Sequence, residues 1–165
     1  HITPHRMTSI RPMQQKSFDA YRLASAQGYA HDNVTAGRWP DSGAFERALE
    51  DFDQSLPQGL STPNNFVFDI RDDAKQETVG VIWFGVVEKN GIKSAFVYDV
   101  EVIAKHQRQG HARATFELLE PIVRQLGLQR IGLHVFKQNT GAQALYSSLG
   151  YEVTGINMLK QLRTQ

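Results

Sequence analysis

Apolar residues recur at helical spacing in the first third of the chain and then change to an alternating, strand-like pattern. A first strand is expected at residues 8–11, and an amphipathic helix over residues 14–34. After a break at residues 36–40, a second helix is expected to start at a cap formed by Asp41 or Ser42. The apolar positions that define the two helices are Phe18, Tyr21, Leu23, Ala26, Phe45, Ala48, Leu49 and Phe52.

The middle of the chain predicts an antiparallel meander of three strands. These strands are expected at residues 66–70, 79–87 and 95–103, where alternating or β-rich apolar residues are bounded by turn signals. Asn90 followed by Gly91 is typical of a tight hairpin, so the second and third of these strands should pair directly.

A strand, a helix and another strand then follow one another between residues 95 and 136. The helix should begin near His111, bend at Pro121 and end at Gly127, because proline removes a backbone donor and glycine commonly stops helices. The next strand is expected over residues 131–136. Such a crossover normally joins parallel strands, so the sheet should be mixed.

The last quarter predicts one short helix and two closing strands. Thr140 and Gln143 fit a capping box at the start of the helix, and Gly150 should end it. The closing strands are expected at residues 151–153 and 156–162. The predicted fold class is therefore α/β, with a mixed, mostly antiparallel central sheet of about seven strands and helices on both faces.

Composition narrows the classes of protein that this fold can serve. The chain has 165 residues, 41% of them hydrophobic, a formal net charge of +1 and no cysteine. Those values favour a globular domain, disfavour nucleic-acid or membrane partners held by bulk charge, and exclude disulfides, thiolate metal sites and a cysteine nucleophile. No apolar stretch approaches the length of a membrane helix, and no signal peptide is recognisable.

One domain is expected over residues 7–165, because no linker or repeat interrupts the pattern. Met7 is expected to be the native start, and residues 1–6 an added vector remnant. The protein is expected to be cytoplasmic.

The segment most indicative of chemistry runs from residue 102 to residue 113, from a strand end through a loop into a helix start. A helix N-terminus presents unpaired N–H groups and partial positive charge, which suit a phosphate. Gly110 would let the backbone approach a pyrophosphate closely, and Lys105, Arg108 and Arg113 add positive charge. The alternative is a solvated basic loop that caps the helix. The nucleotide P-loop and the dinucleotide glycine motif are both absent.

The motif Gln107-x-x-Gly110-x-Ala112 resembles the Gln/Arg-x-x-Gly-x-Gly/Ala signature of the GNAT superfamily of N-acetyltransferases. A second stretch is similar to a further motif of that superfamily, and the order of elements matches from residue 8 to residue 162. This second stretch comprises Asn139, Ala142, Leu145, Tyr146, Leu149, Gly150 and Tyr151. The chain departs from the commoner pattern in having Gln107 where arginine is usual and Ala112 where glycine is usual.

The resemblance implies that acetyl-CoA is the co-substrate and that it binds at the edge where the fourth and fifth strands part. Main-chain groups of Val100 and Val102 should bond the pantetheine arm, Asn139 should touch it, and Tyr146 should lie near the thioester sulfur. The pyrophosphate should be held by the N–H groups of the segment Gln107, Arg108, Gln109, Gly110, His111, Ala112 and Arg113. No metal is expected.

Acetyl transfer to an amine requires a base, an oxyanion donor and an acid. Tyr146 is the candidate acid for the leaving thiolate, although a helix-face aromatic can also be a core residue. Glu101 and His134 are the candidate bases, with Asp99 behind them, and His134 can alternatively be structural. Strand N–H groups near Val102 are the candidate oxyanion donors. Because there is no cysteine, direct transfer in a ternary complex is the simplest scheme.

The first two helices are expected to wall the acceptor pocket, as the resemblance implies. Candidate substrate-binding residues are Tyr29, His31, Arg38, Trp39 and Asp99. The acidic residues of the second helix favour a cationic amine, or are simply a solvated face. A small amine, an amino acid, an antibiotic and a protein amine all remain open as acceptors.

Two other functions compete with the enzyme. A non-catalytic acyl-CoA-binding sensor would keep the phosphate cradle and lose the acid and base. A nucleic-acid binder would use the basic loop, but near-neutral charge and the lack of a binding motif disfavour it. A homodimer is compatible with the exposed strand edges that the fold implies.

Overall fold

The computed structural model describes residues 7–164. The expectations for residues 1–6 lie outside the described residues. The strands are β1 (Thr8–Pro12), β2 (Asn65–Asp72), β3 (Glu77–Lys89), β4 (Ile92–Val102) and β5 (Ile131–Leu133). The helices are α1 (Gln15–Thr35), α2 (Ala44–Ser55), α3 (His111–Gln125) and α4 (Thr140–Ser148), with short 3₁₀ turns η2 (Gly59–Ser61) and η3 (Ala104–His106).

The sheet is mixed, as the sequence pattern predicted. Its order is β1-β2-β3-β4-β5, and the first three pairings are antiparallel. β5 lies parallel to β4, so the β4-α3-β5 segment is the expected crossover. The tight hairpin between β3 and β4 is also confirmed, because Asn90 and Gly91 both have positive φ angles, of 55° and 78°.

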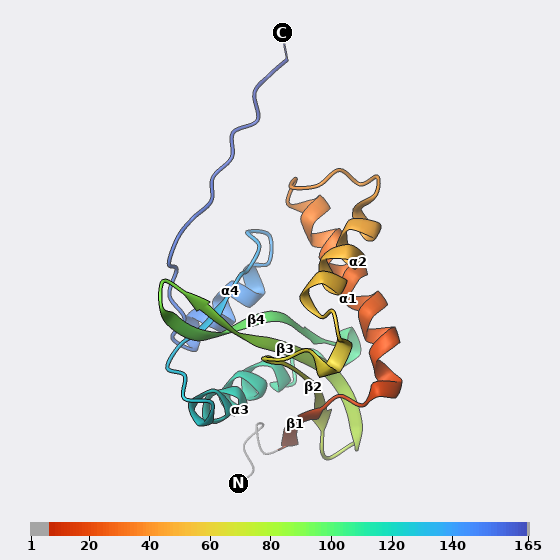
Figure 1. Ribbon diagram of the computed structural model, residues 1–165, viewed down its shortest axis with the longest axis vertical. Helices are drawn as coiled ribbons and strands as arrows, with labels where there is room; N and C mark the ends of the chain where they lie inside the picture. Colours follow the sequence, from red (N-terminus) through yellow and green to blue (C-terminus); the bar gives the residue numbers. More distant parts are fainter. Residues whose placement is uncertain (1–6, 165) are drawn as a thin grey trace.

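Within residues 7–164 the sheet has five strands, and the prediction of about seven was wrong. Neither residues 151–153 nor residues 156–162 form a strand, and β5 stops three residues short of the predicted end. The reason is physical: a strand needs a neighbour for its backbone groups. Residues 151–164 instead run away from the body as an extended arm (Figure 1).

Two apolar layers hold helices on opposite faces of the sheet (Figure 1). On one face, α3 covers a core that includes Ile82 and Phe84 of β3, both fully buried, and α4 adds Tyr146. On the other face, α1 and α2 cover Val81 and Trp83 of the same strand. Because β3 is buried on both faces, its apolar run is continuous rather than alternating.

Helices α1 and α2 pack closely on each other through small side chains. Ala26 and Ala30 of α1 meet Ala44 and Ala48 of α2 in a separate buried cluster. This contact fixes the angle at which the two helices rise above the sheet, and so shapes one wall of the site described below.

Two predicted helix caps were wrong. α2 starts after Gly43, which adopts a left-handed conformation with φ 77° and offers no side chain, so neither Asp41 nor Ser42 caps it. The cap of α4 is Asn139, whose side-chain oxygen accepts a hydrogen bond from the N–H of Ala142 at 3.3 Å. Thr140 is therefore the first residue of that helix rather than its cap. Within residues 7–164, no helix combines the length and the apolar character that crossing a bilayer requires.

Candidate active site

The site is organised by an irregularity in β4. In the pairing with β3, Phe84 faces Val97 while Trp83 faces Asp99, so Tyr98 is an extra residue that forms a β-bulge. β5 pairs with β4 only at residues 95–97. Beyond the bulge, the edge of β4 that faces β5 therefore has no strand partner.

Backbone alternation shows which groups line this open edge. The carbonyl of Glu101 lies against Gly80 of β3, and the N–H of Ile103 donates to Val79 of β3 at 2.8 Å. Since successive residues point their backbone groups to opposite edges, those of Val100 and Val102 face the open side. The sequence singled out these two residues as candidates to bond a pantetheine arm, and that role stays a prediction.

The loop between β4 and α3 is preorganised as an anion cradle. Arg108 and Gly110 have left-handed φ angles of 63° and 88°, which turns consecutive N–H groups of the loop toward one concave side. Gly110 is the N-cap of α3 and no side chain caps this helix, so its first N–H groups remain available to a ligand. The side-chain amide of Gln107 donates to the carbonyl of Val102 at 2.8 Å and ties the loop to the strand end.

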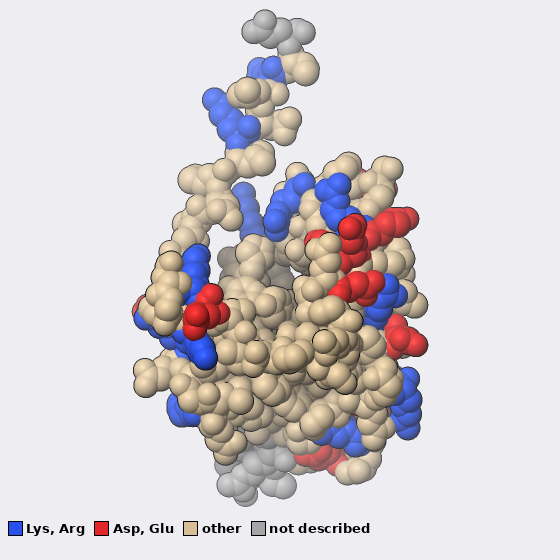
Figure 2. Space-filling view, in the orientation of Figure 1, with Lys and Arg blue, Asp and Glu red and all other residues tan. Residues whose placement is uncertain are grey.

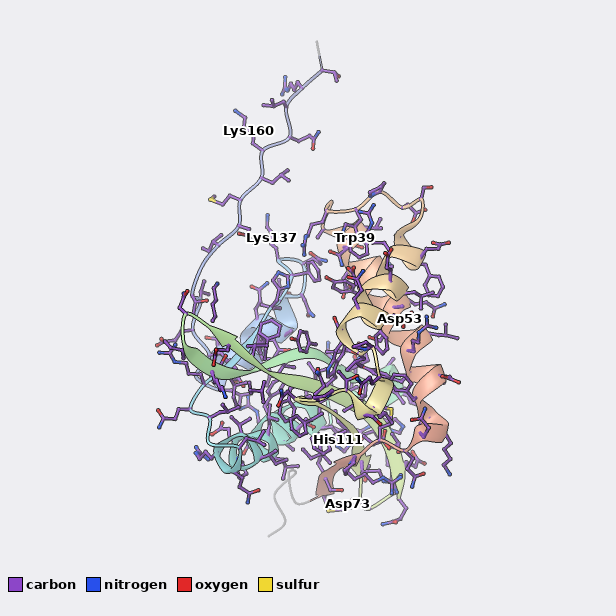
Figure 3. The ribbon with its side chains drawn as sticks, in the orientation of Figure 1. Trp39, Asp53, Asp73, His111, Lys137 and Lys160 are labelled. Carbon is purple, nitrogen blue, oxygen red and sulfur yellow. The ribbon has the colours of Figure 1, made fainter. Side chains whose placement is uncertain are left out.

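The side chains of two other cradle residues, His111 and Arg113, contact residues outside the loop. The His111 ring is buried, with Nδ1 2.8 Å from the Thr8 hydroxyl and Nε2 3.3 Å from the Asp72 carboxylate, at the base of the molecule (Figure 3). Arg113 donates to the Ser148 hydroxyl of α4 at 2.7 Å. His111 thus contributes only its main chain to the cradle, while Arg113 keeps an exposed cationic side chain beside it.

An acidic group lies on the α1 side of β4. The carboxylate of Asp99 accepts hydrogen bonds from Tyr21 at 2.7 Å and Ser25 at 3.2 Å. Burial raises the pKa of Asp99, against the lowering effect of these bonds and with a smaller contribution from Asp32. Burial likewise raises the pKa of Glu101, and the negative charges of Asp99 and Asp32 raise it further. This environment suits a carboxylate that takes a proton.

Tyr146 reaches the site from α4. Its ring is half-buried, 5.2 Å from Phe116 and 5.8 Å from Tyr151 between ring centroids. Burial raises the pKa of Tyr146, and the charge of Asp99 adds to the effect. The ring thus packs against core aromatics, and the role of the hydroxyl as an acid stays a prediction.

The residues that follow β5 face α1 across the site. The Arg38 guanidinium lies 5.9 Å from the centre of the Phe136 ring, and His134 packs edge-on to the same ring at 4.8 Å. Partial desolvation of the His134 ring and the positive charge of Arg38 together lower the pKa of His134. Gln138 donates to the backbone carbonyl of Asp32 at 3.3 Å and closes the gap between the two segments.

The other predicted acceptor residues lie farther along the α1–α2 wall. Tyr29 and Trp39 pack edge to face, with ring centroids 5.3 Å apart, and Arg47 stacks on Trp39 at 5.4 Å. Figure 3 places Trp39 near the end of this wall, level with Lys137.

The acidic residues of α2 lie mainly on the outer surface. Asp53 is exposed and forms a bidentate pair with Arg22, at 2.6 and 2.7 Å. Figure 2 shows acidic side chains over the outer side of the α1–α2 lobe, and basic ones at the rim of the hollow beside it. The alternative of a solvated face thus describes Asp53 well.

Several residues of the site were not identified from the sequence. Asp32, Tyr21 and Ser25 come from α1, and Phe136 and Gln138 come from the loop after β5. No sequence signal singles them out, because the α1 residues lie among many other polar residues and the two loop residues belong to no motif. Among residues 7–164, no three histidine or carboxylate side chains are grouped as a metal site would need.

Comparisons with known proteins agree with this architecture. The profile of the Acetyltransferase (GNAT) family matches residues 24–151. Two Bacillus subtilis relatives, each named an uncharacterized N-acetyltransferase, are YdgE, 32% identical over 93% of this chain and 98% of its own, and YycN, 29% identical over 93% and 97%. The crystal structure of YycN superposes with a TM-score of 0.89, covering 95% of this chain and 99% of that one.

A more distant likeness concerns the fold alone. The aminoglycoside 6'-N-acetyltransferase AAC(6')-Ih from Acinetobacter baumannii is 16% identical, with a TM-score of 0.62 over 96% of this chain and 99% of that one. The chain belongs to the GNAT family of acetyltransferases. It is an acyltransferase of a family that uses acetyl-CoA and acts on amines, as the sequence motifs had implied.

Proposed function

We propose that this enzyme transfers the acetyl group of acetyl-CoA directly to a cationic amine while both are bound. The observation that carries the proposal is the position of β4 between two features. Its backbone edge at Val100 and Val102 is open beside the anion cradle, and its side chains Asp99 and Glu101 face α1. One strand thus lies between a site for an acyl carrier and a site for an amine.

The donor side fits acetyl-CoA through main-chain groups. The uncapped start of α3 and the left-handed residues Arg108 and Gly110 suit the pyrophosphate, and Arg113 adds a charge. The backbone of Val100 is available to the pantetheine amides, and the N–H of Val102 is left for the thioester carbonyl, since the Val102 carbonyl is already bonded to Gln107. Bound there, acetyl-CoA supplies a thioester carbonyl as the electrophile.

We assign the base to Glu101 rather than His134. An alkyl ammonium must lose a proton before its nitrogen can attack, and a carboxylate with a raised pKa accepts that proton more readily. The neighbouring carboxylates Asp99 and Asp32 attract the ammonium. His134 lies beside the Arg38 guanidinium, whose charge repels a cation, so we assign His134 to the acceptor wall.

Tyr146 is proposed to protonate the leaving thiolate. Its raised pKa keeps the phenol protonated at neutral pH, as a proton donor must be. The negative charge that develops on the carbonyl oxygen is stabilised by the free N–H of Val102. Because the chain has no cysteine, no thiol group can hold the acetyl in between, and the amine attacks the thioester directly.

The first test is a calorimetric titration of acetyl-CoA into the wild type and two variants. Arg113→Glu reverses charge beside the cradle and should weaken binding at least tenfold. Lys89→Glu makes the same charge change at the exposed end of β3 and should bind as the wild type does. Wild-type protein that shows no saturable binding would refute the donor site.

The second test separates an enzyme from an acyl-CoA sensor. Release of free CoA is followed with a panel that holds a diamine, an α-amino acid, an aminoglycoside and a peptide amine. The carboxylates of Asp99 and Glu101 on β4 and of Asp32 on α1 predict that turnover is fastest with amines whose ammonium group is accessible and flexible. Saturable binding with no turnover on any amine would instead favour the sensor.

A further inference from the structure

The acceptor side of the site carries a cation as well as carboxylates. Arg38 follows the end of α1, and its exposed guanidinium lies 5.9 Å from the centre of the Phe136 ring. Among residues 7–164, no carboxylate lies within ion-pair distance of this guanidinium. An aromatic ring stabilises the face of a guanidinium and leaves its in-plane N–H groups free. Arg38 therefore keeps the fork of donors that binds an anionic group through two parallel hydrogen bonds.

The loop that carries Arg38 is held by hydrogen bonds to α1. The backbone carbonyl of Asn33 accepts from the N–H of Arg38 at 2.9 Å and from that of Trp39 at 3.3 Å. Asn33 is fully buried, and its side-chain amide donates to the backbone carbonyl of Tyr29 at 2.8 Å. These bonds set the course of the chain after α1, so little ordering is needed when Arg38 binds a ligand.

The carboxylates of the site lie apart from this cation. Asp99 and Glu101 lie on β4, and Asp32 lies in the last turn of α1. Burial raises the pKa of Asp32, and the charge that opposes this effect is that of His31 rather than that of Arg38. The acceptor wall thus has a negative end at β4 and a positive end beyond α1, and neither end neutralises the other.

The two ends are joined where the segment after β5 meets α1. Gln138 donates to the backbone carbonyl of Asp32 at 3.3 Å, and Phe136, two residues earlier, lies under Arg38. Lys137 lies between them in the sequence and is exposed, and Figure 3 places it at the upper end of the gap between the two segments. A molecule that reaches from this rim to β4 therefore passes from positive to negative surroundings.

We propose that the acceptor is an amine that carries an anionic group, a carboxylate or a phosphate, at its other end. This inference rests on the proposed function, since it places the ammonium group against Asp99 and Glu101 as that function does. The Arg38 guanidinium binds the anionic group. Each end of such a molecule is attracted by one end of the wall and repelled by the other, so the amine enters in a single orientation.

Matched amines test this inference. The series comprises ω-amino carboxylates from glycine to 6-aminohexanoate, their primary amides, and diamines and aminoalkyl phosphates of the same lengths. Release of free CoA should give a kcat/KM about tenfold higher for the best anionic amine than for its neutral amide, mainly through a lower KM, because charge-assisted hydrogen bonds are the stronger ones. Amides or diamines that are used as well as both kinds of anionic amine would overturn the inference and leave the proposed function standing.

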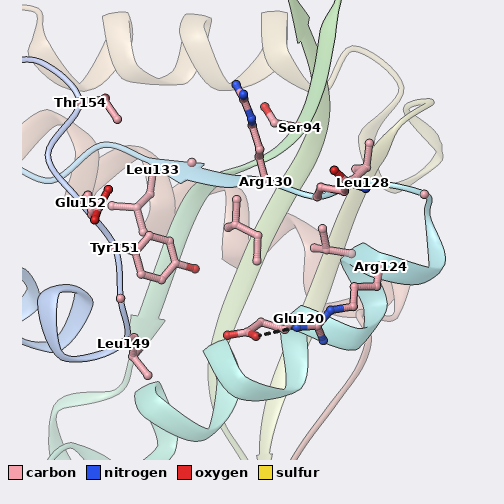
Figure 4. A pocket seen from close by; sticks show the side chains of 16 residues that line it. Ser94, Glu120, Arg124, Leu128, Arg130, Leu133, Leu149, Tyr151, Glu152 and Thr154 are labelled. Atoms are coloured by element: carbon pink, nitrogen blue, oxygen red, sulfur yellow. Dashed lines mark hydrogen bonds and ion pairs between the residues drawn. The ribbon is translucent and has the colours of Figure 1, made fainter.

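Variants of two arginines assign the preference to one side chain. Arg38→Gln should lower kcat/KM about tenfold more for the anionic amines than for the amides, and Arg38→Glu should reverse the order in favour of diamines. The control is Arg130→Gln. Arg130 also lines a hollow and forms no ion pair within the described part of the chain, but its cavity, of about 1080 Å³, lies between β5, α3 and residues 149–154 (Figure 4). A preference that survives Arg38→Gln, or that Arg130→Gln abolishes equally, would refute the role of Arg38.

A binding measurement separates this inference from turnover. The anionic amines are titrated calorimetrically into protein saturated with free CoA, which has no acetyl group to transfer. Saturable binding that is at least tenfold weaker in Arg38→Gln supports the inference, and binding that is absent or equal in the two proteins overturns it. Arg38-dependent binding together with no turnover of any amine would count against the proposed function alone.

Discussion

Gly80 of β3 is the position where one methyl group should damage the site most. A Cβ added there would lie 2.1 Å from the backbone carbonyl oxygen of Glu101, whereas real Cβ contacts essentially never fall below 3.0 Å. The obstacle is backbone, which cannot rotate away as a side chain can. Gly80→Ala must therefore push β4 outward by about 1 Å at Val102, which pairs with Gly80, and at the neighbouring Glu101.

The size of the effect follows from this displacement. Forcing extra volume into a packed interior costs about 1–3 kcal/mol, which for a chain of this length lowers the melting temperature by about 2–4 °C per kcal/mol. Misplacing catalytic groups by about 1 Å lowers the rate by about 100-fold. We expect Gly80→Ala to lower the melting temperature and to lower kcat/KM by about two orders of magnitude.

A matched control tests whether crowding is the cause. At Gly28 in α1 an added Cβ would meet no heavy atom within 4 Å, so Gly28→Ala should stabilise the helix by up to about 1 kcal/mol and leave turnover unchanged. Thermal melts followed by circular dichroism and CoA release measure both variants. If Gly80→Ala melts and turns over like the wild type, the assumed rigidity of the β3–β4 pair is wrong.

Four further variants test the proposed roles. Tyr146→Phe keeps the ring and removes the hydroxyl that would donate the proton, so kcat should fall by about 10²–10⁴-fold while acetyl-CoA affinity stays unchanged. Turnover equal to that of the wild type would leave Tyr146 with a packing role only. The base must be deprotonated and the pKa of Glu101 is raised, so kcat/KM should fall as the pH drops through that raised pKa. Glu101→Gln should abolish this acidic limb of the pH profile, whereas His134→Gln should retain it. Gln107→Ala loses the 2.8 Å bond to the Val102 carbonyl, worth about 1 kcal/mol, and calorimetry should show acetyl-CoA binding weakened about fivefold.

The regular elements were predictable because each depends on local periodicity. The first helix was predicted over residues 14–34 and is observed at Gln15–Thr35, and the β3–β4 hairpin follows from Asn90 and Gly91. The strand end, loop and helix start at residues 102–113 were predictable for the same reason, since these residues are contiguous in sequence.

What failed depended on partners distant in sequence. The interaction of Asp32 with Asp99 and Glu101 arises only when α1 lies across β4, which no local pattern specifies. The closing strands predicted at residues 151–153 and 156–162 do not form, because a strand needs hydrogen-bond partners for its backbone and these residues pair with no strand among residues 7–164. Local preference therefore predicted the conformation of the arm but not its pairing.

The bulge at Tyr98 explains how one strand can serve both substrates. Before the bulge, Ala95 and Val97 face the α3 side of the sheet; after it, Val100 and Val102 face the same side although the count has shifted by one. The shift directs the carboxylate of Asp99 toward α1, and the loss of pairing with β5 leaves backbone groups free at the strand edge. In the proposed function, donor and acceptor are recognised by different groups of the same few residues, backbone for one and side chains for the other. Such an arrangement brings the amine to the thioester without any movement of an acetylated side chain. The geometry of β4 and the lack of cysteine therefore both favour direct transfer.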